Sequence, residues 1–268
     1  MTNPTDLADL AVIAETAAQL GRTLLHSSHL TDIRHKSDRD TVTNVDLTIE
    51  REIRTYLARA TPHIGFYSEE HNGTTPLDIT GPVWTLDPID GTANYTHGLP
   101  LCAVSLALIH HGQPTVAVID APFLDLRYTA THGHGAYANG HRIHVSTTTN
   151  LADAIVAIGD YAVGPGAAEK NTRRLNLTAT LAQHVERIRM FGTAALDLAW
   201  LAQGRIDAAI MLSNKPWDTA AGTLIAKEAG AHITDAHNNP HTPHSKETIS
   251  TTPGITQPLH ELIHASTQ

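Results

Sequence analysis

The stretch WTLDPIDGTANY, from Trp84 to Tyr95, places two carboxylates three residues apart after an apolar segment and then breaks into Gly-Thr. An Asp-Gly pair after a strand is also a strong hairpin signal, so the turn alone says nothing about chemistry. Pro88 has a fixed φ and stiffens the link between Asp87 and Asp90. The two side chains can converge only if something offsets their repulsion. Mg²⁺ prefers carboxylate and carbonyl oxygens, so the stretch favours a divalent-metal site.

The residues around this stretch extend the hypothesis toward phosphate chemistry. Gly91 and Thr92 present backbone amides and a hydroxyl at a turn that can open a helix, an arrangement suited to a phosphate oxygen. Glu69 ends an expected strand in HIGFYSEE, and Asp218 begins an expected helix in KPWDTAAGTLIAKEAG. Alone, Asp218 is as well explained as a helix cap or dipole partner. Together, the carboxylates predict metal-activated water that attacks a phosphate in line.

Composition and charge narrow the class of protein. The 268 residues (28.8 kDa) are 41% hydrophobic and 17% charged, which suits one large core or two coupled ones. A formal net charge of −9 argues against a nucleic-acid or acidic-membrane binder, because no basic stripe is present. The start lacks a basic leader, and no run of about 18 apolar residues occurs, so we expect a cytoplasmic protein.

Cysteine and histidine usage adds two smaller expectations. The only cysteine, Cys102, lies in an apolar run and is expected to be a core residue, with no disulfide within the chain. The 19 histidines contain no HExxH motif, and many neighbour Gly, Asn or Pro in expected turns. They favour dispersed, solvated histidines over a zinc site.

Hydrophobic periodicity predicts two halves with different architectures. In residues 1–149 we expect helices over 7–25 and 45–61, a charged loop over 34–44 and a largely antiparallel sheet that includes a strand ending at Asp87. In residues 150–268 we expect strands over 155–159, 188–191, 206–212 and 231–234. Helices expected over 169–184, 193–203 and 217–229 alternate with these strands. The first half is therefore predicted to be α+β and the second α/β, with a shared interface.

WTLDPIDGTANY and WDTAAGTLIAKEAG together resemble the signatures of the inositol monophosphatase family of Mg²⁺-dependent, lithium-sensitive sugar phosphatases. DTVTNVD, YSEEH, GHGAYANG and FGTAAL follow the family's order and roughly its spacing, so the resemblance spans nearly the whole chain. It implies an α/β fold of the layered αβαβα sandwich type and a phosphoric monoester hydrolase that uses two or three Mg²⁺ ions. Since many relatives are homodimers, a homodimer is expected.

The resemblance also implies a role for each matching residue. The metal ligands are expected to be Glu69, Asp87, the main-chain oxygen of Ile89, Asp90 and Asp218. Asp46 and Thr92 are expected to orient and deprotonate the attacking water, with Glu69 beside them in the catalytic group. The remaining matches are substrate contacts: Gly91 and Thr92 at the phosphate, Gly192, Thr193 and Ala194 along the hydroxyl side of the substrate, and Asp218 near the leaving oxygen.

Departures from the family pattern concern the substrate more than the chemistry. Met211 stands where inositol-specific relatives carry a glutamate that contacts ring hydroxyls, and an apolar residue makes no such bond. Ser68 replaces the usual glycine before Glu-Glu, and EAGA replaces EAGG. Inositol 1-phosphate is the favoured substrate, with histidinol phosphate, fructose 1,6-bisphosphate and 3′-phosphoadenosine 5′-phosphate as alternatives. A different class of function, a protein-binding partner of transcription machinery, stays open beside catalysis.

Overall fold

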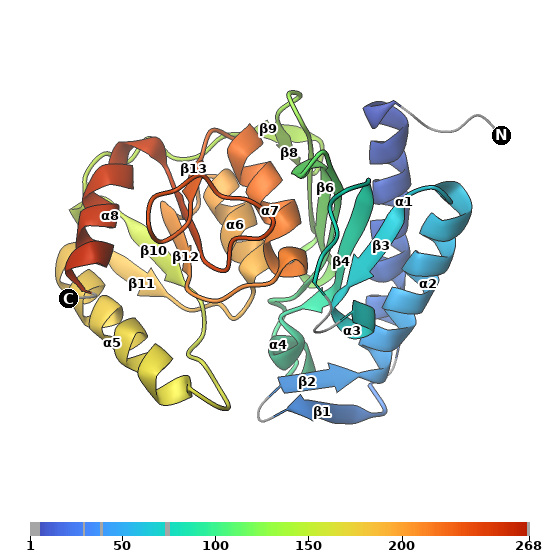
Figure 1. The fold of residues 1–268 in the computed structure, drawn as a ribbon, viewed down its shortest axis with the longest axis horizontal. Helices are drawn as coiled ribbons and strands as arrows, with labels where there is room; N and C mark the ends of the chain where they lie inside the picture. Colours follow the sequence, from blue (N-terminus) through green and yellow to red (C-terminus); the bar gives the residue numbers. More distant parts are fainter. Residues whose placement is uncertain (1–5, 29, 38–39, 73–75, 267–268) are drawn as a thin grey trace.

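The computed structural model describes residues 6–28, 30–37, 40–72 and 76–266. Its elements form five layers, helix, sheet, helix, sheet and helix, which run from right to left in Figure 1. The predicted αβαβα sandwich is therefore confirmed. The two large sheets are each covered on both faces, so their strands alternate between two different cores.

The first outer layer consists of α1 (Leu7–Ser27) and α2 (Asn44–Ala60). Helix α2 buries Val45, Ile49, Ile53 and Leu57, an apolar stripe of helical spacing. Both helices pack on the seven-stranded sheet, whose order is β3-β4-β5-β6-β7-β8-β9. These strands are β3 (Gly65–Ser68), β4 (Val83–Asp90), β5 (Ala103–His110), β6 (Gln113–Ala121), β7 (Leu126–Thr131), β8 (Ala136–Ala138) and β9 (His141–Ile143). Only the β3–β4 pair is parallel among them, which matches the predicted antiparallel sheet.

The middle layer consists of α6 (Ala194–Ala202) and α7 (Pro216–Glu228), which lie between the two sheets (Figure 1). Strand β5 shows the division, because Val104, Leu106 and Leu108 face α1 and α2. Ala107 and Ile109 point the other way, into the core shared with α6 and α7. The small residues of α7 permit close approach: a Cβ at Gly222 would lie 2.5 Å from Leu198 Cδ1 of α6.

The second sheet has five strands in the order β11-β10-β12-β14-β13. They are β10 (Ile155–Ile158), β11 (Arg187–Arg189), β12 (Ala208–Met211), β13 (His232–Thr234) and β14 (Thr248–Thr251). Strand β10 pairs in parallel with β11 and β12, while β14 is antiparallel to both of its neighbours. Its outer face packs on α5 (Ala167–His184) and α8 (Thr256–Ala265), so helices cover this sheet too.

Several sequence-based assignments were wrong or incomplete. The expected charged loop over 34–44 overlaps the strands β1 (Ile33–Ser37) and β2 (Asp40–Thr43), which pair with each other. Strand β4 continues past the expected end at Asp87 to Asp90. Strand β14 and helix α8 were not predicted. Hairpin pairing and packing on a neighbouring layer stabilise these segments, and neither shows in a short window of sequence.

Two further expectations can be compared with the fold. Cys102 is fully buried in the core beneath α1 and α2, as predicted. The division at residue 149/150 stays a prediction, and the largest apolar core includes residues from both sides of it. No helix among the described residues is long and apolar enough to cross a membrane.

Candidate active site

A bulge in β4 brings the two carboxylates of the opening stretch to one cleft. Asp87 pairs with Ser105 and Asp90 with Ala103, so three steps on β4 match two on β5. In a regular strand, residues separated by three point to opposite faces. The extra residue changes this, because a bulge redirects the side chains that follow it. Pro88, which has no N–H to donate, lies within this irregular segment.

Gly91 turns the chain directly from β4 into the short helix α4 (Thr92–Thr96). Its φ of 85° lies in the left-handed region, which glycine adopts without a steric penalty. A Cβ at this position would lie 2.7 Å from the carbonyl oxygen of Leu101, so any larger residue would collide with the backbone. The predicted turn that opens a helix is confirmed, and Asp-Gly does not form a hairpin here.

Asp46 is held at the start of α2 by a reciprocal cap. Thr43 is the N-cap, and its hydroxyl and its backbone N–H both donate to Asp46 Oδ2. The other carboxylate oxygen, Oδ1, accepts a hydrogen bond of 3.3 Å from Thr92 Oγ1. Thr92 Oγ1 also lies 2.8 Å from the carbonyl oxygen of Ile89. The proposed water-activating pair is thus joined directly, with Asp46 buried behind Thr92.

The remaining two carboxylates come from different layers. Glu69 is the first residue of the short helix α3 (Glu69–Asn72), directly after β3. Asp218 lies in the first turn of α7, where its Oδ2 accepts a hydrogen bond of 2.7 Å from the backbone N–H of Lys215. The cap role considered from the sequence is therefore real, but Asp218 also faces the cleft. Pro216, at the first position of α7, has no N–H to leave unpaired.

Asp90 connects the two halves of the molecule. Its Oδ2 accepts hydrogen bonds from the Thr193 hydroxyl and, at 2.8 Å, from the backbone N–H of Ala195. Asn94 of α4 makes a second connection, because its Nδ2 donates to the carbonyl oxygens of Leu101 at 2.8 Å and Phe191 at 2.7 Å. These hydrogen bonds hold residues 192–195, the GTAA segment, beside the turn at Gly91 that follows β4.

These elements enclose a cleft of about 300 Å³. Ten of the predicted site residues line it: Glu69, Asp87, Ile89, Asp90, Gly91, Thr92, Gly192, Thr193, Ala194 and Asp218. Asp46 does not line the cleft and reaches it only through Thr92. The volume suits a small, polar ligand.

Burial and mutual repulsion perturb the acids of this cleft. Burial, then the charges of Glu69 and Asp90, raise the pKa of Asp87 well above its usual range. Burial raises the pKa of Asp218 to about 8 and that of Asp90 to about 6, although hydrogen bonds to each carboxylate oppose the rise. Burial also raises the pKa of Asp46. Carboxylates with pKa values raised by desolvation and mutual repulsion are typical of functional sites, where a cation can offset the repulsion.

The donor chemistry of the cleft fits a hard divalent cation. Four carboxylates and the Ile89 carbonyl are all oxygen ligands, the kind that Mg²⁺ prefers. No group of three or more His, Cys, Asp or Glu in the described part of the chain already has the arrangement of a metal site, whether for Mg²⁺ or for zinc. Repulsion between anionic carboxylates opposes a tight cluster until a cation joins them, so this spacing is compatible with a metal-binding donor set.

Nine residues that line the cleft were not identified from the sequence, and four of them carry a charged or amide side chain: Asp160, Arg174, Asp197 and Asn214. Asp197 is 2% exposed, and its Oδ1 has no hydrogen-bond partner among the residues that the structure describes, while burial raises its pKa well above the usual range. Its position in LDLAW, inside an apolar helix, was the one available signal. The other three follow strands or lie on α5, where sequence pattern alone does not reveal which side chains meet.

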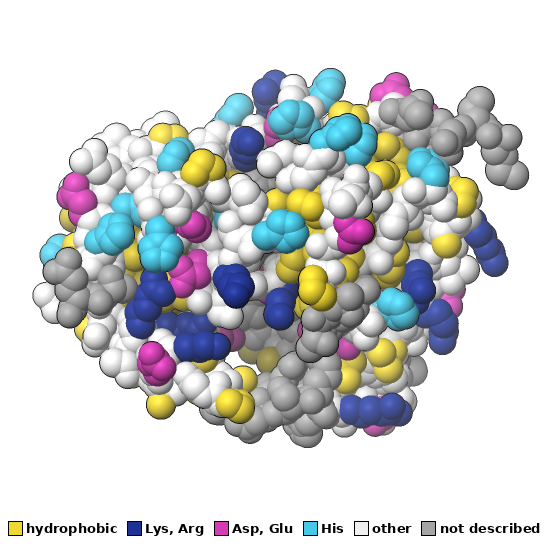
Figure 2. Space-filling view, viewed as in Figure 1, with side chains coloured by type: hydrophobic (Ala, Val, Ile, Leu, Met, Phe, Trp, Pro, Cys, Tyr) yellow, Lys and Arg dark blue, Asp and Glu magenta, His cyan; other side chains and the backbone are white. Residues whose placement is uncertain are grey.

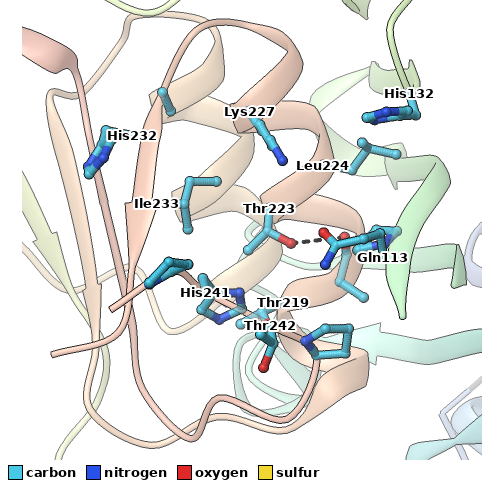
Figure 3. Close-up of a pocket in the computed structure, with 15 residues that line it drawn as sticks. Gln113, His132, Thr219, Thr223, Leu224, Lys227, His232, Ile233, His241 and Thr242 are labelled. Atoms are coloured by element: carbon cyan, nitrogen blue, oxygen red, sulfur yellow. Dashed lines mark hydrogen bonds between the residues drawn. The ribbon is translucent and has the colours of Figure 1, made fainter. Parts of the chain in front are cut away.

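A second pocket, of about 220 Å³, lies along α7, β13 and the loop before β14 (Figure 3). Thr223, Leu224 and Lys227 of α7 face it, together with His132 and His241. None of the described residues that line it is Asp or Glu, so it lacks the donors for a Mg²⁺ site. The carboxylate cleft is therefore the stronger candidate for the active site.

Comparisons with known proteins show the family to which the chain belongs. The family model described as "Inositol monophosphatase family" matches residues 5–268. The chain is 34% identical to the inositol-1-monophosphatase ImpA of Mycolicibacterium smegmatis, over 86% of this chain and 83% of that protein. It is also 34% identical to the fructose-1,6-bisphosphatase/inositol-1-monophosphatase of Thermotoga maritima, over 79% and 78% respectively. The crystal structure of the extragenic suppressor protein suhB from Bartonella henselae matches with a TM-score of 0.86 and 33% identity, over 95% of this chain and 98% of that one.

Proposed function

The chain belongs to the inositol monophosphatase family of metal-dependent phosphatases, and from this premise we propose that it hydrolyses a small phosphate monoester with Mg²⁺. An inositol monophosphate is the favoured substrate. The observation that supports this proposal most strongly is the convergence of Glu69, Asp87, Asp90 and Asp218 on one cleft, beside the turn at Gly91. The four carboxylates come from three separate segments of the chain. Packing of an apolar core does not require charged side chains to gather in this way, so their convergence indicates a functional site.

Each group in the cleft has a role that its position supports. Glu69, Asp87, Asp90, Asp218 and the Ile89 carbonyl would hold two or three Mg²⁺ ions. When bound, these ions supply charge stabilisation for the attacking and leaving oxygens and lower the pKa of water. The backbone at Gly91 and Thr92, at the start of α4, would bind a phosphate oxygen.

Proton transfer falls to the pair at the start of α2 and α4. Thr92 Oγ1 donates to Asp46 Oδ1, so the Thr92 oxygen keeps a lone pair that can accept a proton from the attacking water. Asp46 is buried and can take the proton that Thr92 donates to it. Gly192, Thr193 and Ala194 would position the leaving alcohol along the opposite wall.

Substitution of Asp90 tests the carboxylate assignment. We expect Asp90→Asn to reduce Mg²⁺-dependent phosphate release by at least about 100-fold, because it removes one charged ligand while keeping the oxygen that Thr193 and Ala195 can bond. Phosphate release at saturating Mg²⁺ is the measurement, with circular dichroism to check the fold. Asp9→Asn, an exposed change on α1, is the matched control and should leave the rate unchanged. Wild-type turnover in Asp90→Asn would refute the assignment.

A panel of four substrates tests the identity of the alcohol. Met211 is buried and lines the cleft, so no carboxylate at that position accepts a hydrogen bond from a ring hydroxyl. Phosphate release from inositol 1-phosphate, histidinol phosphate, fructose 1,6-bisphosphate and 3′-phosphoadenosine 5′-phosphate should be compared with and without lithium. We expect lithium to inhibit. Activity confined to histidinol phosphate would rule out the inositol assignment.

We further propose a homodimer, as the resemblance implied, with analytical ultracentrifugation as its test. The cytoplasmic location stays a prediction from the sequence. A role as a protein-binding partner of transcription machinery, without catalysis, is less well supported. A chain freed from catalysis need not keep Asp46, Glu69, Asp87, Asp90, Thr92 and Asp218, and this chain has all six.

A further inference from the structure

The second pocket, beside α7, carries polar groups that the proposed hydrolysis does not use. Thr219, Thr223 and Lys227 line it at spacings of four residues, so they form one stripe along α7. The stripe begins one residue after Asp218 of the cleft. Lys227 and His241 lie at opposite ends of the pocket in the view of Figure 3, with Thr223 between them. The volume of about 220 Å³ is just below the roughly 300–1,000 Å³ of sites for drug-sized ligands, so a smaller molecule fits.

The charge of this pocket favours an anion. Lys227 makes no ion pair or hydrogen bond with a described residue, and no described residue that lines the pocket is Asp or Glu. The carboxylates of Glu228 and Asp235, beside the pocket, each accept hydrogen bonds of 2.8 or 2.9 Å from two backbone N–H groups. Figure 2 shows His side chains, with Lys or Arg among them, over α7 near the top of the face drawn in Figure 1. A small anion can therefore bind here although the chain as a whole is acidic.

The hydrogen bonds around His241 leave one of its ring nitrogens free to accept. Asn214 Nδ2 donates to the Ser245 carbonyl oxygen at 3.0 Å, so Asn214 Oδ1 accepts the hydroxyl proton of Thr248, also at 3.0 Å. The Thr248 oxygen then accepts from His241 Nε2 at 2.9 Å, which places the ring hydrogen on Nε2. Burial lowers the pKa of His241 to about 4, so the ring is neutral at pH 7. His241 Nδ1 has no partner among the described residues and can accept an N–H or O–H from a ligand.

The same chain of hydrogen bonds connects the pocket to the catalytic cleft. His241 lines the pocket, whereas Asn214 lines the cleft. The loop between β13 and β14 contacts both, because its residues 241–243 line the pocket. The carbonyl oxygens of Ser245 and Lys246, in the same loop, accept hydrogen bonds from Asn214, each of 3.0 Å. A ligand that fixes this loop therefore also fixes Asn214 in the cleft.

We propose that this pocket is a regulatory site for a small organic anion that also carries an N–H or O–H donor. The anionic group binds Lys227, the donor binds His241 Nδ1, and an apolar body lies against Leu224 and Ile233. The ligand holds the loop between β13 and β14 in the position where Asn214 lines the cleft, so it tightens binding in the cleft. By linkage, an occupied cleft tightens binding in the pocket by the same factor. This inference does not depend on which phosphate monoester the cleft hydrolyses.

Ligand-observed NMR titration of the full chain measures binding in the pocket directly. The probe is 4-hydroxybenzoate, which has a carboxylate and an O–H at opposite ends of a flat ring. We expect benzoate, which lacks the donor, and 4-hydroxybenzyl alcohol, which lacks the anion, to bind at least about 5-fold more weakly. Lys227→Gln should weaken binding of the probe about 10-fold. Lys170→Gln, an exposed change on α5, is the matched control and should leave it unchanged. Equal affinities for the three compounds, or no loss in Lys227→Gln, would overturn the site.

Calorimetric titration of inorganic phosphate at saturating Mg²⁺ tests the connection to the cleft. Saturating 4-hydroxybenzoate should lower the Kd of phosphate by about 5-fold or more, and phosphate should lower the Kd of the probe by the same factor. Thr248→Val removes the hydroxyl between His241 and Asn214. It should keep binding of the probe within about 3-fold of the wild type and lose most of this coupling.

The wild type alone suffices to reject the proposal, even if Thr248→Val does not fold. Binding of the probe without a reciprocal shift would exclude a regulatory role. Weaker binding of the probe in the presence of phosphate would mean that the probe occupies the cleft, and would also exclude it. Absence of metal-dependent phosphate release from every substrate would instead contradict the proposed function, so the two failures are distinguishable.

Discussion

In the proposed mechanism, the proton of the attacking water passes through a single hydroxyl, that of Thr92. Its oxygen lies 3.3 Å from Asp46 Oδ1 and 2.8 Å from the Ile89 carbonyl oxygen, so its one proton has two possible acceptors. Only the bond to Asp46 creates a route for a proton away from water. The methyl group of threonine makes no part of this route, so serine should replace it and valine should not.

We therefore expect Thr92→Val to lower kcat by about 10²- to 10⁴-fold, the usual contribution of general base catalysis. Thr92→Ser should retain most of the rate because the hydroxyl is kept. Steady-state kinetics at saturating Mg²⁺ measure both effects. If the valine variant matched the serine variant in kcat, the Thr92 hydroxyl would have no part in activating water.

At the level of single residues, the sequence predicted which carboxylates meet, but it did not predict the backbone geometry that brings them together. Asp87 and Asp90 were expected to converge, and the bulge in β4 explains how they do so. The bulge itself was not predicted, because the strand was expected to end at Asp87, and an irregular pairing depends on the neighbouring strand β5. Arg174 and Asp197 were missed for a related reason: their place in the cleft follows from the layers that meet around them.

At the level of elements, the two helices of the middle layer, α6 and α7, approach each other closely at Gly222. A Cβ at Gly222 would lie 2.5 Å from Leu198 Cδ1 and 2.6 Å from Leu198 Cβ, closer than any ordinary contact. Gly222 is buried within α7, the helix that carries Asp218 at its start. Its small size therefore sets the distance between this helix and α6.

We expect Gly222→Ala to lower the free energy of unfolding by roughly 1–3 kcal/mol through overpacking. Combining it with Leu198→Ala should cost less than the sum of the two single changes, because the added methyl fills space that the leucine leaves. Urea denaturation of the four proteins measures this coupling. Gly81→Ala, where nothing lies within 4 Å of the new Cβ, is the control. Strict additivity would show that α6 and α7 can separate at no cost.

His241, in the loop before β14, makes folding sensitive to acid. Its Nε2 lies 2.9 Å from Thr248 Oγ1, and burial lowers its pKa from 6.5 to about 4. The unfolded chain therefore takes up a proton below pH 6.5 while the folded chain does not. The fold loses stability as pH falls from about 6.5 to 4, by at most roughly 3 kcal/mol, and the loss is complete below that range.

Thermal denaturation of the wild type and of His241→Gln between pH 7.5 and 4 tests this dependence. The difference between the two curves isolates His241, because the other titrating groups contribute equally to both proteins. We expect His241→Gln to lose less stability than the wild type over this range. His244→Gln, an exposed change nearby, should behave like the wild type. Parallel curves for all three proteins would mean that His241 is protonated in the fold. Its burial also corrects the expectation that the loop histidines are all solvated.

Elements with a strong apolar period were predicted well, whereas those that depend on pairing were not. The stripe of Val45, Ile49, Ile53 and Leu57 was sufficient to place α2. Strands β1 and β2 lie in a charged segment whose composition resembles a loop, and they exist because they pair with each other. The spacing of apolar residues in a sequence indicates which face of an element is buried. The β1–β2 hairpin lies in a charged segment, so its sequence gives little indication of this kind.

At the level of the whole molecule, the candidate site lies where the two halves meet. Asp90 from β4 accepts hydrogen bonds from Thr193 and Ala195, and Asp218 at the start of α7 reaches the same cleft from the other half. The apolar core that contains α6 and α7 also includes residues of the seven-stranded sheet. A shared interface was expected from the sequence, but the use of α7 as the wall common to both sheets was not, because α7 lacks a single apolar stripe.

This arrangement predicts how metal and stability are linked. A cation held by Asp90 and Asp218 binds only the folded molecule, so at 100 times its dissociation constant it adds about 2.7 kcal/mol, a rise in Tm of roughly 5 °C or more for a chain of this size. Because both halves supply ligands and share a core, calorimetry should show one transition that moves as a unit when Mg²⁺ replaces EDTA. Asp218→Asn should remove most of this shift, while in EDTA its Tm should equal or exceed that of the wild type, since one repelling carboxylate is gone. Two separate transitions, of which Mg²⁺ moves only one, would mean that the halves fold independently and that the cleft does not join them.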